Sequence, residues 1–170
     1  MKGLRLLATG GALPGRVVTN EDLRRQVDTS DEWITERTGI RARHLAGEET
    51  TVSMAAAAAE KALKRAGAEP SEVELLIVAT ISGDTVTPST ACRVQALIGA
   101  DQAVAFDINA ACSGFLYALH MADACVKSGM YKNALLIGAE TLSKLVDWND
   151  RGTCILFGDG AGAAFVEATE

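Results

Sequence analysis

The sequence predicts an α/β fold with a largely parallel sheet. Three short apolar runs have the composition of buried strands, and segments with helical character separate them; the runs cover residues 73–80, 103–107 and 134–138. Because helices that cross between consecutive strands keep those strands parallel, we expect most of the sheet to run in one direction. The 170 residues can bury one substantial core, so residues 1–170 are expected to form one domain.

The N-terminal part begins with a strand expected at residues 4–9, where a glycine pair ends it. Thr19 or Asn20 can cap a helix that runs to about Val27, and a cap-rich turn at residues 28–31 precedes a second short helix. A strong helix is expected over residues 51–66. Its five consecutive alanines indicate close packing against a neighbouring element.

The remaining elements follow the same alternation. A helix is expected over residues 89–98, and residues 142–151 form an irregular stretch. The glycine run at residues 158–162 is followed by a strand-like segment at 163–166 rather than by a helix, so a phosphate-binding loop is rejected. These glycines are expected to allow close backbone approach and turns with positive φ.

Cys112 is expected in the first turn of a helix that runs to about Ser128. This helix is apolar almost all round, which predicts a core helix packed on several sides. Unpaired N–H groups and the positive end of the helix dipole favour a thiolate at its start. A buried cysteine is by itself more often a packing residue than a nucleophile, so further observations must decide.

The surroundings of Cys112 favour a nucleophile. The residues beside it are small and leave space for another molecule; they are Ala110, Ala111, Ser113 and Gly114. Asp107 and Asn109 precede the helix, where their side chains can accept hydrogen bonds from backbone donors and fix the turn.

A base for this nucleophile is missing from the sequence pattern. The chain has two histidines, His44 in a basic turn and His120 two helical turns beyond Cys112, and neither is a convincing base. We therefore expect the rest of the site to lie outside this chain.

Trp33 and Arg37 are four residues apart and share one helical face. The simpler interpretation is a tryptophan that anchors the helix, with an arginine stacked on it. The alternative is an exposed aromatic surface with a cation, suited to a nucleotide base and its phosphates. Spacing alone favours the simpler interpretation.

Composition excludes several function classes. A formal net charge of −6 argues against nucleic-acid binding and against attachment to anionic membranes. We find neither a signal peptide nor a transmembrane helix, and expect a cytoplasmic protein. The four cysteines are widely and unevenly spaced, which indicates free thiols rather than a metal site or a disulfide framework.

Four groups of residues, in register along nearly the whole chain, closely resemble β-ketoacyl-acyl-carrier-protein synthase III, the initiating condensing enzyme of bacterial type II fatty acid synthesis; they are residues 28–40, 88–92, 106–115 and 150–163. The resemblance covers the N-terminal half of that family, whose members are dimers of two similar α/β halves in the thiolase fold. It implies a thiolase-like half with a mostly parallel mixed sheet, helices on both faces and a buried central helix starting at Cys112.

The resemblance also implies roles for individual residues. Cys112 would take the acyl group from acyl-CoA as a thioester, with its backbone N–H as one oxyanion-hole donor. Trp33 and Arg151 would sandwich the CoA adenine. Thr29 and Arg37 would contact the nucleotide and its phosphates.

Three further residues would control the acyl group. Leu142 and Phe157 would line the acyl pocket, and Thr87 would reach the pocket of the partner subunit. Family members often have a bulky aromatic residue at the position of Thr87. The threonine therefore leaves room for a longer or branched primer.

The implied reaction is acyl transfer to Cys112 and decarboxylative condensation with malonyl-acyl carrier protein, without a cofactor or a metal. The implied partners are acyl-CoA, acyl carrier protein, a second subunit, and the C-terminal half that supplies a histidine and an asparagine. The alternatives are a catalytically incomplete half that acts as a CoA-binding or assembly module, and a related polyketide- or quinolone-priming synthase. An isolated half is expected to expose a large apolar face.

Overall fold

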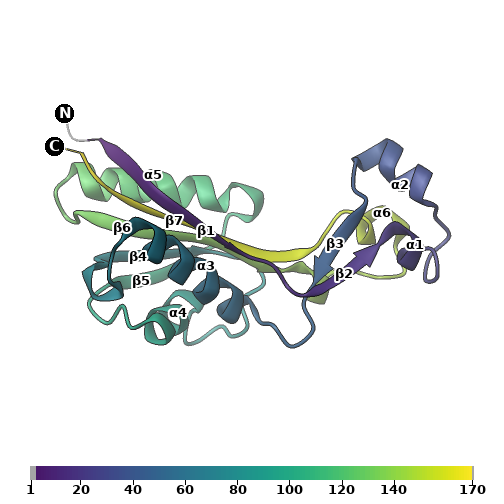
Figure 1. Ribbon diagram of the computed structural model, residues 1–170, viewed down its shortest axis with the longest axis horizontal. Coiled ribbons are helices and arrows are strands. Elements are labelled where there is room, and N and C mark those ends of the chain that lie inside the picture. Colours follow the sequence, from purple (N-terminus) through teal and green to yellow (C-terminus); the bar gives the residue numbers. More distant parts are fainter. Residues whose placement is uncertain (1–2, 170) are drawn as a thin grey trace.

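A five-stranded mixed sheet forms the larger lobe of the computed structural model, which describes residues 3–169 (Figure 1). In spatial order its strands are β1 (Leu4–Ala12), β7 (Asp159–Ala168), β6 (Asn133–Thr141), β4 (Leu75–Ala79) and β5 (Val104–Ile108). β4 pairs in parallel with β5 and β6, and β7 pairs antiparallel with β1 and β6. Only β7 therefore opposes the other four strands, which confirms the mostly parallel mixed sheet.

Helices cover both faces of this sheet, as expected. α3 (Thr51–Ala66) and α4 (Thr90–Ile98) lie on one face, and α5 (Gly114–Lys127) lies on the other (Figure 1). The α3 helix begins at a capping box of Thr50 and Ser53 and ends at Gly67, whose φ of 70° is left-handed. Short 3₁₀ turns, η1 (Pro70–Glu72) and η3 (Leu142–Lys144), precede β4 and follow β6.

The α5 helix is buried on one face only. Ala118, Ala122 and Val126 are buried against the sheet, whereas Leu116 and Tyr117 remain 59% and 54% exposed. The expectation of a helix packed on several sides is therefore wrong for the chain as it stands, because residues 3–169 provide no second layer over α5. The large exposed apolar surface expected of an isolated half is present.

The glycines of β1 belong inside the strand rather than at its end. The strand continues through Gly10 and Gly11 to Ala12, past the expected end at residue 9. A Cβ atom on Gly10 would lie 2.1 Å from the carbonyl oxygen of Ala58 and 2.6 Å from the backbone N of Ala62. The alanine run of α3 thus packs directly on the backbone of β1, as its composition indicated.

The glycine run at residues 158–162 also lies in extended backbone. β7 begins at Asp159, and none of the three glycines of this run has a positive φ. A Cβ atom on Gly160 would lie 2.9 Å from Leu13 Cδ2. The expected close approach is confirmed, but the expected positive-φ turns are wrong, since the run pairs with β1 and β6.

A smaller lobe lies at the far end of the long strands β1, β6 and β7 (Figure 1). It contains the antiparallel pair β2 (Arg16–Thr19) and β3 (Ala42–Leu45) and three short helices, α1 (Asn20–Leu23), α2 (Asp31–Thr38) and α6 (Arg151–Cys154). The sequence did not predict this pair or α6, because four-residue elements show too little periodicity. The α1 helix ends at Leu23, before the expected Val27. The hydrophobic core of the smaller lobe joins segments that are distant in sequence, through Leu23, Ile34 and Cys154.

No helix in the described part of the chain has the length and apolar character needed to cross a membrane.

Asp84 gives the fold a measurable pH dependence. Its side chain is 11% exposed; it accepts hydrogen bonds from the N–H groups of Thr51 and Val52 at the start of α3, and from Lys144 Nζ. Burial raises the pKa of Asp84, but these donors outweigh it and hold the pKa below its usual value. The stabilisation is therefore complete above the unfolded-state pKa of about 4 and is lost as pH falls through the lower folded-state pKa.

We expect Asp84→Asn to lower the free energy of unfolding by about 1–2 kcal/mol at pH 7, and by less at pH 3. Urea denaturation at both pH values measures this. The exposed Asp101→Asn is the control and should change little at either pH. An equal loss from Asp84→Asn at both pH values would contradict the role of its charge.

Candidate active site

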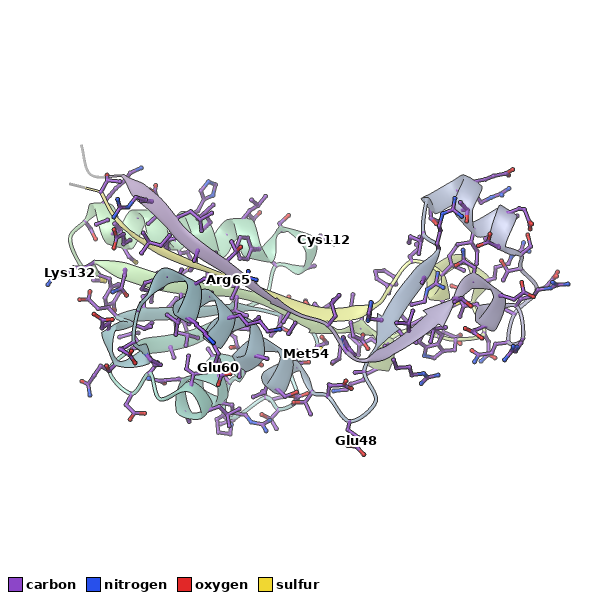
Figure 2. All side chains as sticks on the ribbon, viewed as in Figure 1. Glu48, Met54, Glu60, Arg65, Cys112 and Lys132 are labelled. Atoms are coloured by element: carbon purple, nitrogen blue, oxygen red, sulfur yellow. The ribbon has the colours of Figure 1, made fainter. Side chains whose placement is uncertain are left out.

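Cys112 lies in the 3₁₀ turn η2 (Ala111–Ser113), between the end of β5 and the start of α5, and its side chain is exposed. It sits at the end of α5 that points toward the smaller lobe (Figure 2). Ala111 has a φ of 46°, which costs roughly 1–2 kcal/mol for a residue other than glycine. Such local strain at an exposed cysteine is typical of a functional turn.

The small residues around Cys112 serve two purposes. Gly114 is buried, and a Cβ atom there would lie 3.0 Å from Ala79 Cβ, so this glycine lets the turn rest on the end of β4. Ala111 and Ser113 are exposed, and they leave the sulfur accessible. The first N–H groups of η2 have no intrahelical acceptor, so they can donate to a ligand next to the sulfur.

The predicted role of Asp107 is wrong. Its carboxylate accepts hydrogen bonds from the N–H groups of Thr90 (2.8 Å) and Ala91 (2.6 Å), in the first turn of α4. Because β5 ends beside the start of α4, the carboxylate caps that helix instead of the turn that carries Cys112. Asn109 is exposed and lines a separate pocket.

A pocket of about 510 Å³ opens beside Cys112. Its other lining residues come from the loop after β4, from η2, from the end of β6 and from the segment that leads into β7; they are Ile81, Ala111, Glu140, Leu142, Leu145, Val146, Asp147, Thr153 and Phe157. The predicted acyl-pocket residues Leu142 and Phe157 thus lie with Cys112 in one cavity. Thr87 is exposed and does not line it.

Most of these lining residues were not identified from the sequence. Four of them lie between Leu142 and Phe157, where no helical or strand period marks them; they are Leu145, Val146, Asp147 and Thr153. This stretch connects β6 to β7, and the two strands pair with each other, so its two ends lie at the same edge of the sheet.

No histidine of the described chain lines this pocket. The Nδ1 atom of His44 lies 2.7 Å from the carbonyl oxygen of Pro14, and His120 lines a different groove. Two carboxylates line the pocket, those of Glu140 and Asp147. The Glu140 oxygens accept hydrogen bonds from the N–H groups of Ile81 and Ser82 and from the Ser82 hydroxyl, and Asp147 accepts from the N–H and the side-chain amide of Asn149. Glu140 therefore fixes the loop after β4 and is poorly placed to take a proton.

Cys154 is a packing residue and differs from Cys112 in burial and surroundings. It is fully buried in the core of the smaller lobe, where burial raises the pKa of its thiol. Cys112 is the cysteine that combines exposure with an adjoining cavity.

A second cluster lies on the smaller lobe around Trp33. The guanidinium carbon of Arg37 lies 4.4 Å from the centroid of the Trp33 ring, and that of Arg151 lies 4.7 Å from it. Trp33 also packs on the core below, as the simpler interpretation expects, and the nucleotide-binding interpretation stays a prediction. The structure brings α2 and α6 together here, although more than one hundred residues separate them in sequence.

This cluster can attract anions. Arg37 donates to the carbonyl of Trp33 and Arg151 to that of Asp28, and neither forms an ion pair within residues 3–169. Thr29 adds a buried hydroxyl oxygen that has no hydrogen-bond partner there. Two uncompensated guanidinium groups beside an aromatic ring suit a base with phosphates.

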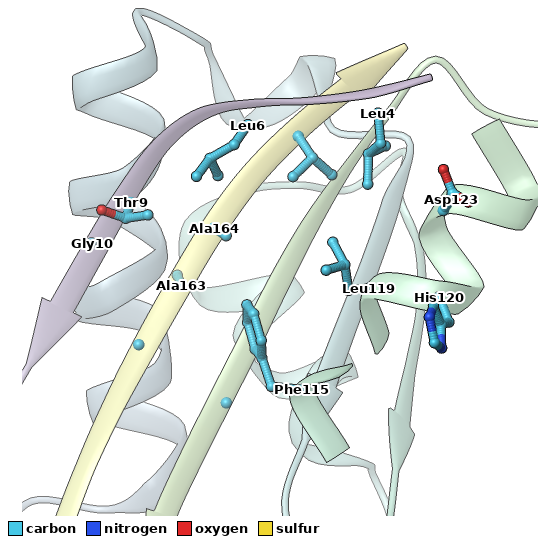
Figure 3. A pocket seen from close by; sticks show the side chains of 13 residues that line it. Leu4, Leu6, Thr9, Gly10, Phe115, Leu119, His120, Asp123, Ala163 and Ala164 are labelled. Atoms are coloured by element: carbon cyan, nitrogen blue, oxygen red, sulfur yellow. The ribbon is translucent and has the colours of Figure 1, made fainter. Parts of the chain in front are cut away.

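An apolar groove of about 740 Å³ lies between α5 and the strands β1 and β7 (Figure 3). Phe115 and Leu119 point into it from the helix, and Leu4 and Leu6 border it on β1. Glycines and alanines form its floor on β6 and β7. His120 and Asp123 are the titratable side chains that line it.

Within the described residues, no group of three or more histidine, cysteine, aspartate or glutamate side chains could hold a metal ion.

The fold and this site define the class of protein. A mixed sheet with helices on both faces, and a cysteine on the turn that leads from β5 into α5, are the features of a thiolase-like fold. The structure superimposes on crystal structures of condensing enzymes of that fold. The β-ketoacyl-acyl-carrier-protein synthase III of Aquifex aeolicus matches with a TM-score of 0.97 and 56% identity, over 99% of this chain and 55% of that one. The priming β-ketosynthase of the R1128 polyketide pathway matches with a TM-score of 0.95 and 39% identity, over 98% and 50%.

The sequence comparisons point to one family among these enzymes. The family model for 3-oxoacyl-[acyl-carrier-protein (ACP)] synthase III matches residues 106–170, and the synthase III of Erythrobacter litoralis is 55% identical over 95% of this chain and 51% of its own length. The chain is a homologue of β-ketoacyl-acyl-carrier-protein synthase III, which confirms the resemblance. It spans about half the length of the relatives it matches.

Proposed function

We propose that this chain carries the acyl-accepting half of a β-ketoacyl-acyl-carrier-protein synthase III. The observation that supports this most directly is the position of Cys112, exposed on the η2 turn and facing a pocket lined by Leu142 and Phe157. The Cys112 thiolate attacks the thioester carbonyl of acyl-CoA. The new S–C bond forms as CoA leaves as its thiolate, which takes up a proton. The N–H of Cys112 donates to the oxyanion.

The second half of the reaction needs groups from elsewhere. Malonyl-acyl carrier protein loses CO₂, the resulting carbanion attacks the acyl carbonyl, and the Cys112 thiolate leaves as β-ketoacyl carrier protein forms. A histidine and an asparagine of the missing half support this step. No metal or redox cofactor takes part in the proposed reaction.

The experiment that tests the proposal is intact mass spectrometry of the 170-residue chain with acetyl-CoA and with hexanoyl-CoA. We expect the mass to rise by one acyl group. A chain that gains no mass from either thioester is the catalytically incomplete CoA-binding or assembly module, and the enzyme proposal then fails.

The same experiment addresses a second candidate, a polyketide-priming synthase. The close superposition on the R1128 priming ketosynthase favours it. Thr87, in place of a bulky aromatic residue, would leave room for a longer primer in the partner's pocket. A clear preference for hexanoyl-CoA over acetyl-CoA would support a long-primer enzyme.

We propose that the cluster around Trp33 binds the CoA adenine and phosphates, with Thr29 and Arg37 beside them. Arg151 already lies 4.7 Å from the Trp33 centroid, and contacting carbon atoms need about 3.5–4 Å, so no second ring fits between them. The Arg151 side chain must therefore move to receive the base between itself and Trp33.

Trp33→Ala is expected to weaken CoA binding by about tenfold and to leave 4′-phosphopantetheine binding unchanged, because only CoA carries the base. Isothermal titration calorimetry with both ligands measures this. Trp148→Ala is the matched control, since Trp148 packs on the same core and has no cation over its ring among residues 3–169. An equal loss of CoA affinity in both variants would argue against the assignment.

The apolar groove and the exposed face of α5 are proposed to receive the other half of the synthase, and a second subunit completes the dimer. The isolated chain should therefore associate at micromolar concentration rather than sediment as one monomer. Sedimentation velocity tests this. A single monomeric boundary would contradict it. We assign the enzyme to the cytoplasm, because its four free thiols suit a reducing compartment.

A further inference from the structure

We propose that Arg43 is a positioning residue for the CoA nucleotide. One buried set of hydrogen bonds from its guanidinium holds the helix that carries Arg151 in a fixed position relative to the helix that carries Trp33. The inference rests on the proposed function, since it concerns the same ligand. No sequence pattern pointed to Arg43.

Arg43 is an unusual residue for a small lobe. It lies on β3 and is only 5% exposed, and within residues 3–169 it forms no ion pair. A buried guanidinium without a carboxylate is costly unless its hydrogen bonds are satisfied. Its location in the lobe therefore calls for a structural reason beyond packing.

The first group of contacts leads toward Arg151. The Nη2 atom of Arg43 donates to the carbonyl oxygen of Ile155 at 3.2 Å, one residue after α6 ends. Gly158 packs on the same arginine, because a Cβ atom there would lie 3.2 Å from Arg43 Cβ. Arg43 thus fastens the segment between Arg151 and Phe157 onto β3.

The second group of contacts leads toward Trp33. Nη2 also donates to Asn20 Oδ1 at 2.8 Å, and Nη1 donates to the carbonyl of Val18 at 3.2 Å. Asn20 is 1% exposed, and its Nδ2 donates to Asp31 Oδ1 (2.8 Å) in the first turn of α2 and to the carbonyl of Ile40 (2.7 Å) just beyond that helix. Both ends of α2 are therefore tied to Arg43 through one side chain.

The two groups of contacts meet at Nη2. This one nitrogen donates hydrogen bonds to the carbonyl oxygen of Ile155, just after the helix that carries Arg151, and to the side chain of Asn20, which holds the helix that carries Trp33. A lysine could keep the charge but cannot reproduce this forked set of bonds. We conclude that Arg43 sets the distance between α6, from which the Arg151 side chain extends, and α2, which carries Trp33.

The test uses the 170-residue chain labelled with 5-fluorotryptophan, which gives one ¹⁹F resonance for Trp33 and one for Trp148; Trp33→Phe assigns them. Without ligand, Arg151→Ala shifts the Trp33 resonance by removing its guanidinium. We expect Arg43→Met to shift it in the same direction, and Arg43→Lys to shift it less. Arg65→Met is the matched control, since Arg65 bonds only the carbonyl of Thr9 in the larger lobe, and it should leave both resonances in place.

Calorimetry then separates positioning from general damage. CoA binding should weaken by at least about tenfold in Arg43→Met, while 4′-phosphopantetheine binding stays unchanged. If Arg43→Met does not fold, Arg43→Lys and Asn20→Ala provide the same two measurements. The inference is overturned if folded Arg43 variants leave the Trp33 resonance where it is while Arg151→Ala moves it. Absence of CoA binding by the wild-type chain would refute the proposed function, whereas the ligand-free ¹⁹F shifts would still decide the role of Arg43.

Discussion

Replacement of Cys112 by alanine should abolish the acyl adduct that forms with acyl-CoA. Wild-type chain incubated with acetyl-CoA is expected to gain one acetyl group, and Cys112→Ala is expected to gain none, because the variant has no sulfur to form the thioester. Cys112 is exposed beside its pocket, so truncation removes few packing contacts and the fold should survive. Intact mass spectra under denaturing conditions give both readings.

The chain offers a matched control for this experiment. Cys92 is also exposed, but it lies in α4 and does not line the Cys112 pocket. Cys92→Ala should therefore acquire the acyl group as fully as the wild type. An adduct that persists in Cys112→Ala, or that disappears in Cys92→Ala, would refute the assignment of the nucleophile.

The proposed acyl transfer depends on the backbone as much as on the sulfur. The left-handed Ala111 and the close packing of Gly114 on Ala79 hold η2 at the edge of the sheet, and the first N–H groups of this turn have no intrahelical acceptor. A cysteine in the middle of a regular helix would lack those donors, because its N–H donates to the carbonyl four residues earlier. Cys154, the last residue of α6, is buried in the smaller lobe and therefore lacks the accessibility of Cys112.

The sequence was sufficient to predict the main strands and helices of the larger lobe, but not the strand pair and the last helix of the smaller lobe. The strands β4, β5 and β6 are apolar runs separated by helical segments, so the direction of the sheet follows from local pattern and chain connectivity. The strands β2 and β3 and the helix α6 each contain four residues. Contacts between residues far apart in sequence, such as the hydrogen bond from Arg43 to Ile155, stabilise them. Local patterns contain no such information.

The candidate site divides in the same way. Cys112 could be singled out from its own neighbours, whereas Arg151 was connected with Trp33 only through the family resemblance. The apolar pattern of α5 could not show which of its faces is exposed, because the pattern is the same whether this chain or another covers the helix. Only the resemblance to half of a longer family led to the expectation of an exposed apolar face. The predicted role of Asp107 was wrong for a related reason. A carboxylate at a strand end can cap whichever helix begins nearby, and here α4 begins closer than α5.

Gly10→Ala should be the most destabilising small substitution in the larger lobe, with a loss of about 3 kcal/mol in the free energy of unfolding. The added methyl would meet the carbonyl oxygen of Ala58 at 2.1 Å and the backbone N of Ala62 at 2.6 Å, and helix backbone cannot move aside as a flexible side chain can. The strand β1 must separate from α3 to accommodate it. Urea denaturation monitored by circular dichroism measures the loss.

Gly11→Ala is the matched control because it lies one residue further along the same strand. Its nearest contact would be the carbonyl oxygen of Ala161 at 3.8 Å, an ordinary van der Waals distance. Alanine also reduces the conformational entropy of the unfolded chain, so Gly11→Ala should change stability by less than about 1 kcal/mol. Similar losses in the two variants would show that the strand, rather than the contact with α3, requires glycine. A large loss confined to Gly10→Ala would show that the alanine run of α3 and the glycine of β1 form one close-packed contact, on which the position of β1 in the sheet depends.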